Sequence, residues 1–247
     1  MLRVSKSFIL FIFALTSIGF LYAGELPKIS GQCQTDIIYK KSHLGQNRTF
    51  NWIFWRDSKV FKTKRTIGPF ERARGLGESC EVWSKRRGGE VIQSRVFMNE
   101  KRVIEFSHDD LLILDYKSSW DEVACFASIS AVKKYFKLED VSKWKDSYIE
   151  EIYSHNFGEI KYTVSWLPEL QIARSLIVEN KSMTISVTLK DVESGHSYLD
   201  QLPDISDQFI RYDFADLGDL EEEPGLVSLI HKYSIPHQVC RVKIDQP

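Results

Sequence analysis

The chain of 247 residues carries 33 basic and 34 acidic side chains and has a formal net charge of −1, which argues against a globally basic nucleic-acid-binding protein. Aromatic residues make up 13% of the chain, an amount that argues against disorder and favours strands or an apolar binding surface.

Residues 1–23 have the pattern of an export signal. Arg3 and Lys6 precede an apolar centre at Phe8–Ile18, and Leu21-Tyr22-Ala23 provides a cleavage site near Ala23. A retained membrane anchor is the alternative, but the apolar centre is shorter than the roughly 20 residues that a spanning helix needs. Cleavage removes two basic residues and no acidic ones, leaving a net charge near −3. We therefore expect a periplasmic protein, with residues 24–247 forming a single β-rich domain that ends in an acidic and helical tail.

The stretch FNWIFWR, which begins at Phe50, is predicted to be a strand that is apolar on both sides. Side chains alternate along a strand, so Phe50, Trp52 and Phe54 should share one face. Ile53 and Trp55 should lie on the other face. We expect helices to cover the first set and the C-terminal tail to cover Trp55.

A hairpin followed by another strand is predicted in CEVWSKRRGGEVIQSRVFM and the residues after it. Gly88-Gly89 provides the hairpin turn. The return strand has Ile92, Val96 and Met98 on one side and Gln93 and Arg95 on the other. A turn at residues 99–101 then leads into RVIEF.

Two helices are predicted in the middle of the chain. Ser119 and Glu122 have the spacing of a capping box, in which each side chain satisfies a free amide of the first turn. Apolar residues follow at helical spacing, and a second helix should run from near Ser130 through Tyr135. These helices are the natural cover for a sheet so rich in apolar residues.

Strands resume in the second half. IKYTVSWLPEL should end at Pro168, because proline cannot donate to a strand ladder. ARSLIVE and MTISVTLK flank a turn at residues 180–182, and the strict alternation in MTISVTLK predicts one buried and one wet face. A short helix is predicted to begin near Pro224, with an apolar stripe at Leu226, Leu229, Ile230 and Tyr233.

The four cysteines predict two disulfides, since an even number is typical of an exported protein. They are Cys33, Cys80, Cys125 and Cys240, and their three pairings remain open. The absence of a C-x-x-C pattern argues against thiol redox catalysis and a zinc ribbon.

The order of strands, helices and further strands resembles the LolA-like superfamily of periplasmic lipoprotein carriers. Val164–Ala173, VSWLPELQIA, resembles their strand–turn–strand, and Tyr212–Asp219, YDFADLGD, resembles their aromatic-x-aromatic-x-Asp strand end. The resemblance implies an α+β fold in which a curled antiparallel sheet forms an incomplete barrel and helices cover its concave face. An apolar cavity would lie between them. The turn lacks the usual Asp-Pro and Gly, so no functional residue of the carriers is assigned to this chain.

Six aromatic residues are candidates to line such a cavity and to bind acyl chains, because burial of each CH2 is worth about 0.8 kcal/mol. They are Trp52, Phe54, Trp83, Phe97, Phe106 and Trp166. The alternative interpretation is an ordinary dry core.

Charge is distributed unevenly along the chain. Residues 56–102 hold thirteen basic and six acidic residues, whereas residues 191–223 hold eleven acidic and one basic. The first region could form a positive rim for anionic headgroups or a partner. Alternatively, the two regions are neighbours in the fold and partly neutralise each other, or they are solvated faces.

No catalytic or metal-binding pattern is evident. The chain lacks G-x-S-x-G, and the spacing of His231, His237 and Cys240 fits no standard zinc site. We therefore expect a non-catalytic protein without cofactor or metal that binds a lipid, an acylated protein or another apolar ligand. The main alternative is an interaction or envelope-stress regulatory module with a self-filled core and an envelope protein as partner. An exported hydrolase is a third hypothesis.

Overall fold

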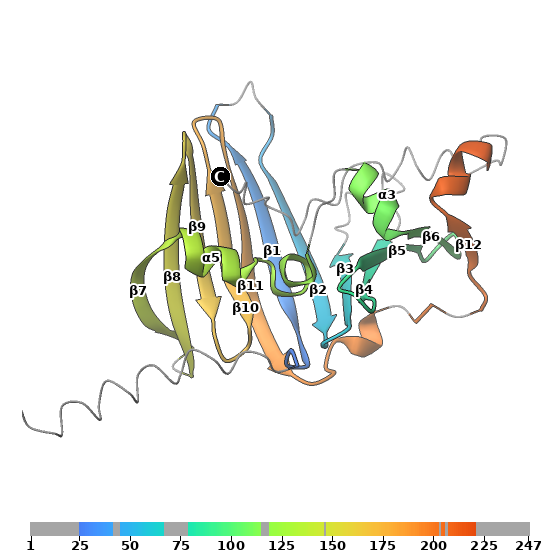
Figure 1. The fold of residues 1–247 in the computed structure, drawn as a ribbon, viewed down its shortest axis with the longest axis horizontal. Coiled ribbons are helices and arrows are strands. Elements are labelled where there is room, and N and C mark those ends of the chain that lie inside the picture. The colour runs from blue at the N-terminus through green and yellow to red at the C-terminus, as the bar shows by residue number, and fades with distance from the viewer. Residues whose placement is uncertain are drawn as a thin grey trace, which may run out of the picture.

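The computed structural model describes residues 25–41, 45–66, 79–114, 119–145, 147–202, 204–205 and 207–220. Within these ranges the chain forms one 12-stranded sheet in the order β12-β6-β5-β4-β3-β2-β1-β11-β10-β9-β8-β7 (Figure 1). The strands are β1 (Ile29–Tyr39), β2 (Arg48–Arg56), β3 (Val60–Thr66), β4 (Ser79–Lys85), β5 (Val91–Phe97), β6 (Arg102–Phe106), β7 (Lys137–Trp144), β8 (Tyr148–Phe157), β9 (Ile160–Leu167), β10 (Ile172–Glu179), β11 (Met183–Ser194) and β12 (Ile210–Asp213). All neighbouring strands are antiparallel except β12 and β6, which are parallel.

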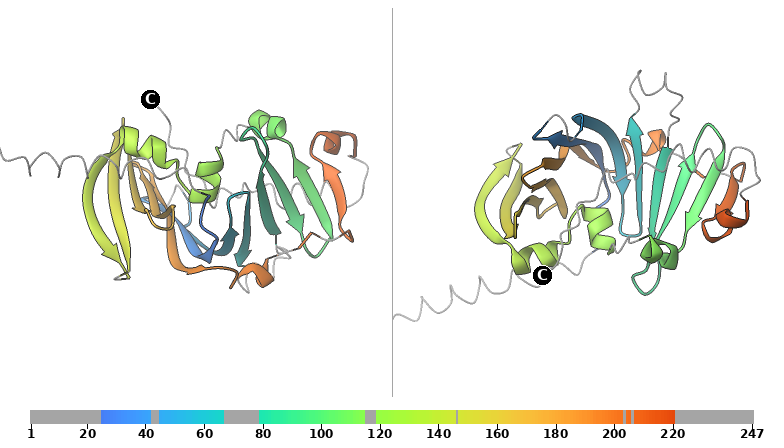
Figure 2. Two further views of the ribbon diagram at one scale, coloured as in Figure 1. Left: turned by 60° about the horizontal axis from the view of Figure 1, so that its bottom comes forward. Right: turned by 90° about the horizontal axis from the view of Figure 1, so that it is seen from above.

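The sheet curls without closing, as Figure 2 shows from two sides. β1 lies between β2 and β11 and so joins the N-terminal strands β2–β6 to the later strands β7–β11. Three short helices connect the two groups: α3 (His108–Ile113), α4 (Trp120–Cys125) and α5 (Ile129–Tyr135). The predicted α+β class with a curled, mainly antiparallel sheet is thus confirmed. No helix in the described ranges has the length and apolar character of a membrane span.

The start of α4 confirms the predicted capping box. Ser119 Oγ accepts a hydrogen bond from the Glu122 backbone N–H at 3.3 Å, and Glu122 Oε2 accepts one from the Ser119 N–H at 2.8 Å. The second predicted helix corresponds to α5. Helix α3 was not predicted, although Ser107 and Asp110 form a capping box of the same kind. Its six residues are too few for a recognisable apolar stripe.

Most predicted strands and turns are present. The Gly88-Gly89 turn joins β4 to β5, β6 follows at Arg102, and β9 ends just before Pro168. Strands β1, β3, β7 and β8 were not predicted. Strand β7 is exposed at the sheet edge, and its many charged residues hide any alternation. The helix expected near Pro224 lies outside the described residues.

Strand β2 is apolar on both sides because both sides are covered. Trp52 and Phe54 belong to the main buried cluster, on the face that we call the inner face. Ile53 and Trp55 lie on the opposite, outer face in a second cluster with Leu202. The predicted division of this strand is therefore confirmed.

Residues 196–202, 204–205 and 207–213, which we call the belt, cross the outer face. Trp55 Nε1 donates a hydrogen bond to His196 Nδ1 at 3.1 Å near the start of the belt. Farther along, Ile205 and Phe209 pack on a third cluster that includes Val96 and Val103 of the outer face. The belt ends as β12 beside β6, at the sheet edge opposite β7. The tail thus covers Trp55 as expected.

The path of the belt makes the acidic and basic regions neighbours, as the second interpretation of the charge pattern requires. The belt belongs to the acid-rich region, and it crosses strands of the basic one. At its end Arg211, the one basic residue of the acid-rich region, pairs with Glu105 of β6, which lies outside the basic region, with Nη1 at 2.6 Å from Oε1.

Gly31 allows β1 to pass closely between its neighbours. A Cβ at this position would overlap the Asp191 carbonyl oxygen and would lie 2.9 Å from Cε1 of the buried Phe54 ring. The register between β1 and β11 shifts at the adjacent Gln32/Cys33 step. Gly31 is therefore required by close backbone approach.

We expect Gly31→Ala to lower the free energy of unfolding by about 1–3 kcal/mol, since overpacking forces a backbone shift between β1 and β11. Urea unfolding would measure the change. Gln32→Ala, at the exposed neighbouring position, should change stability much less. Equal stability of Gly31→Ala and the wild type would show that the two strands separate easily.

Candidate functional site

The inner face carries one large apolar cluster that unites all six predicted aromatic residues. They come from β2, β4, β5, β6 and β9, and none is more than 6% exposed: Trp52, Phe54, Trp83, Phe97, Phe106 and Trp166. Residues of α4 and α5 belong to the same cluster. The predicted residues therefore come together, and in this structure protein side chains surround them.

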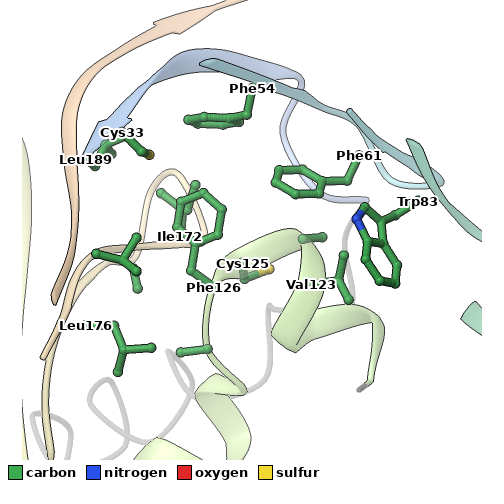
Figure 3. Packing of buried hydrophobic residues seen from close by; sticks show 14 of the residues in the cluster. Cys33, Phe54, Phe61, Trp83, Val123, Cys125, Phe126, Ile172, Leu176 and Leu189 are labelled. Atoms are coloured by element: carbon green, nitrogen blue, oxygen red, sulfur yellow. The ribbon is translucent and has the colours of Figure 1, made fainter. Parts of the chain in front are cut away.

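Phe126 connects the helical segment, by which we mean α4, α5 and the residues between them, to the aromatic residues of the sheet. Its ring centroid lies 5.3 Å from that of Trp52, 5.5 Å from that of Phe54 and 5.9 Å from that of Phe61, each time edge-on. Figure 3 shows Phe126 with Phe54 and Phe61. Such edge-to-face pairs are worth about 0.5–1.5 kcal/mol each beyond the buried area. Phe126 thus occupies the centre of the site.

The backbone places Phe126 there by ending α4 in a left-handed conformation. Phe126 is the C-cap residue, with φ 65° and ψ −5°. A bulky residue rarely adopts this conformation, which glycine usually provides at helix ends. The ring contacts offset that strain. Sequence reasoning missed Phe126 because no pattern marks a C-cap without glycine.

Arg56, at the end of β2, fastens the helical segment to the sheet. Its side chain is fully buried. Nη1 donates to the carbonyl oxygens of Ala124 at 2.9 Å and Gln171 at 2.8 Å, and Nη2 donates to those of Leu170 at 2.6 Å and Pro27 at 3.5 Å. One side chain therefore ties β2 to the last turn of α4, to the turn between β9 and β10, and to the segment before β1.

Arg56 keeps its charge without an acidic hydrogen-bond partner among the described residues. Burial lowers the pKa of its guanidinium, but arginine remains protonated in proteins. The carbonyl dipoles, including one at the negative end of α4, replace the lost hydration. Sequence reasoning missed Arg56 because a charged residue that ends a strand ordinarily faces solvent.

The thiol of Cys125 lies beside this guanidinium, with Sγ 3.6 Å from Arg56 Nη1. Burial raises the pKa of Cys125 from its ordinary 9.0 to about 11, an effect that the positive charge of Arg56 opposes. The thiol is therefore protonated and unreactive at neutral pH.

The structure does not confirm the predicted pair of disulfides. If all four cysteines formed two disulfides, Cys240 would take part in one of them, and the other would have to join two of the remaining three. No disulfide joins Cys33, Cys80 and Cys125 to one another. Cys33 belongs to the inner-face cluster and Cys80 to an outer-face cluster, so the sheet separates them. Cys125 contacts Arg56 instead. Cys240 lies outside the described residues.

Helix α5 is held by different contacts. Phe136, which follows it, stacks on His155 of β8 at 5.1 Å and lies 6.3 Å from the ring of Tyr162 on β9. Lys133 Nζ lies 3.5 Å from Glu151 Oε2. The helical segment is thus attached at two places, by Arg56 and Phe126 at α4 and by these contacts at α5.

The described residues contain no group of three or more side chains suited to hold a metal ion. His231 and His237, near Cys240, lie outside the described ranges. The arrangement around Phe126 offers apolar contact and the buried positive charge of Arg56.

Comparisons with known proteins assign no family. No family model matches the chain, and no curated protein matches it in sequence. PNGF-II is similar with 14% sequence identity and a TM-score of 0.38, over 78% of this chain and 32% of that one. The Pseudomonas aeruginosa MucA/MucB complex is similar with 8% identity and a TM-score of 0.35, over 68% of this chain and 52% of the matched one. A DUF1329 family protein from Desulfovibrio piger is similar with 8% identity and a TM-score of 0.34, over 78% of this chain and 95% of that one. The chain spans about a third of the PNGF-II chain and about half of the matched MucA/MucB chain. Likenesses this weak assign no function.

We expect Arg56→Met to lower the free energy of unfolding by roughly 3 kcal/mol or more, since several buried carbonyl groups lose their donor at once. Urea unfolding would measure the loss, and Arg56→Lys should recover part of it. Arg48→Met, at the exposed start of the same strand, is the matched control and should change little. Similar stability of all three variants would mean that the carbonyl bonds contribute little.

Cys125 should make the folded state less stable in alkaline solution. Its pKa is raised on folding, so between about pH 9 and pH 11 the unfolded chain has lost a proton that the folded chain retains. The free energy of unfolding should therefore fall across this range, by at most about 2–3 kcal/mol from this group. Unfolding at several pH values should show a shallower fall for Cys125→Ala than for the wild type. Parallel curves would contradict this origin.

Proposed function

We propose that this chain is an exported, non-catalytic periplasmic protein of LolA-like architecture that binds the apolar part of a lipid or an acylated protein. In this proposal α4, Phe126 and α5 cover the concave face of the sheet. The ligand lies between them and the aromatic residues of β2, β4, β5, β6 and β9.

The observation that carries the proposal is the position of Phe126. Its ring occupies the middle of a cluster whose other aromatic members belong to the sheet. The ring lies in a segment of two short helices, and helices this short depend on tertiary contacts for their stability. An acyl chain could replace the ring if α4 moved away.

Opening would have a definite cost. It would expose apolar surface at about 25 cal/mol per Å² and break the Arg56 hydrogen bonds to α4. The apparent affinity of a ligand would be reduced by the fraction of molecules that are closed. A ligand must therefore bury enough apolar surface to offset the cost.

One observation favours the alternative of an interaction or regulatory module with a self-filled core. All six aromatic residues are already buried by the protein's own side chains. In that case the inner face would serve stability, and an envelope protein would bind elsewhere on the surface.

Shortening Phe126 distinguishes the two proposals. Phe126→Ala should bind the fluorescent apolar probe N-phenyl-1-naphthylamine about tenfold more tightly than the wild type, because the variant leaves space at the centre of the site and lowers the cost of opening. Fluorescence titration would give the affinity, and lipid extraction of the purified wild-type protein would show whether it carries a ligand.

The matched control is Trp55→Ala. Trp55 is a buried aromatic residue of the outer-face cluster, so its loss should also destabilise the protein. Its probe affinity should equal that of the wild type. Tighter binding by both variants would indicate loosening of the fold. Absence of bound lipid and of saturable probe binding to any of the three proteins would favour the self-filled module.

A further inference from the structure

One end of the inner face is not apolar. The alternation along β5 was predicted to set Gln93 and Arg95 apart from Ile92 and Val96. The structure turns these two polar residues inward, together with Val91 and Phe97 of the main cluster, and Val96 faces the belt. A charged side chain therefore lies on the same face as the aromatic residues.

Within the described ranges Arg95 has one carboxylate near it, and the pairing is loose. It lies opposite Glu81 in the register of β4 and β5, with Arg95 Nη2 at 3.9 Å from Glu81 Oε1. The other oxygen, Glu81 Oε2, accepts a hydrogen bond from Trp83 Nε1 at 3.1 Å. The side chains of Arg95 and Glu81 are only 14% and 12% exposed.

A second observation concerns the Nε atom of Arg95. It is buried, and within the described ranges no acceptor forms a hydrogen bond with it. A buried donor that lacks a partner costs about 1–3 kcal/mol. An anionic oxygen arriving on this side of the guanidinium would remove that cost.

Two further arginines flank the pair on the same face. On β6, Ile104 lies opposite Arg95, and Arg102, two residues earlier, points to the same face. The Arg102 guanidinium is 5.6 Å from the ring centre of Tyr212. On the other side Thr63 lies opposite Glu81, so Arg65 is the next inner residue of β3. Arg65 stacks at 4.0 Å over the Phe50 ring.

The neighbours of these arginines are the candidate ligand-binding aromatics. The Arg95 guanidinium lies 5.5 Å from the ring centre of Phe106, and Arg102 lies opposite Phe97. Arg65 lies opposite Trp52. Positive charge and apolar surface therefore meet on one face, an arrangement that suits a molecule with an anionic head and an apolar tail.

We propose that Arg95, with Arg65 and Arg102, binds the carboxylate or phosphate head of an anionic amphiphile whose tail lies on the aromatic cluster. Guanidinium groups bind both anions through paired hydrogen bonds, and such bonds are stronger away from water. This inference rests on the proposed apolar binding and adds the charge of the ligand to it.

The test uses displacement of N-phenyl-1-naphthylamine by four probes at submicellar concentrations: laurate, dodecyl phosphate, uncharged dodecanol and inorganic phosphate. The wild type should bind laurate and dodecyl phosphate at least about tenfold more tightly than dodecanol. Arg95→Gln should lose that preference, a change of roughly tenfold, and should bind dodecanol as the wild type does.

Glu81→Gln provides a change in the opposite direction. Removing the carboxylate beside Arg95 should raise affinity for both charged amphiphiles several-fold and leave dodecanol unaffected. If Arg95→Gln does not fold, the Glu81→Gln variant still tests whether this site recognises the anionic head. Arg211→Gln is the matched control, because Arg211 is 47% exposed and pairs with Glu105 at the sheet edge. It should behave as the wild type.

Three results would overturn the proposal, each in a different way. Equal affinity of the wild type for dodecanol and laurate would exclude recognition of the head and leave apolar binding intact. Inorganic phosphate that competes as well as dodecyl phosphate would identify a site for the free anion. Failure of every amphiphile, dodecanol included, to displace the probe would exclude the proposed apolar site itself.

Discussion

A buried positive charge that has no carboxylate partner among the described residues organises this protein. Arg56 lies at the end of β2 and is fully buried. Its two terminal nitrogens donate to carbonyl oxygens from three other parts of the chain, whereas its Nε forms no hydrogen bond within the described ranges. Removing an ion from water is costly unless its hydrogen bonds are replaced, so these segments must all be in place before Arg56 can be buried. The position of α4, and with it that of Phe126, depends on this one side chain.

The proposed entry of a ligand requires the helical segment to lift away from the sheet. Carbonyl groups and ring edges hold α4, and no disulfide fixes Cys125. Hydrogen bonds to carbonyls can be exchanged for bonds to water when the segment lifts, whereas the ladders of the sheet would remain. A core that divides along such a boundary suits a protein that admits a guest between two layers.

The sequence predicted the elements that depend on local patterns. The Ser119–Glu122 capping box and the Gly88-Gly89 turn each depend on neighbours within a few residues, and both are present. The alternation of MTISVTLK is present in its second half, where Val187 and Leu189 are buried and Lys190 is exposed, whereas residues 183–186 are all half-buried. The six candidate aromatics were recognised as one set from their character alone. The division of β2 into two apolar faces also followed from alternation.

What the sequence did not reveal depends on distant contacts. Strand β7 is a charged sheet edge, Phe126 adopts an uncommon backbone conformation, and Arg56 finds its acceptors far along the chain. The inward direction of Arg95 also depends on distant contacts, because alternation along β5 divides its residues between two faces but does not say which face meets the main core. The belt on the outer face makes Val96 as buried as Phe97.

The central position of β1 has a consequence for how the protein is made. One neighbour, β2, follows at once, but the other, β11, comes after every remaining antiparallel strand of the sheet. Such remote pairing slows folding, because a long loop must close before its contacts form. Until the ribosome has synthesised β11 as far as Ser194, the backbone N–H and C=O groups on one side of β1 have no strand partner and lie beside an apolar surface. A chain whose synthesis has not yet reached β11 therefore exposes an unpaired strand edge that favours aggregation.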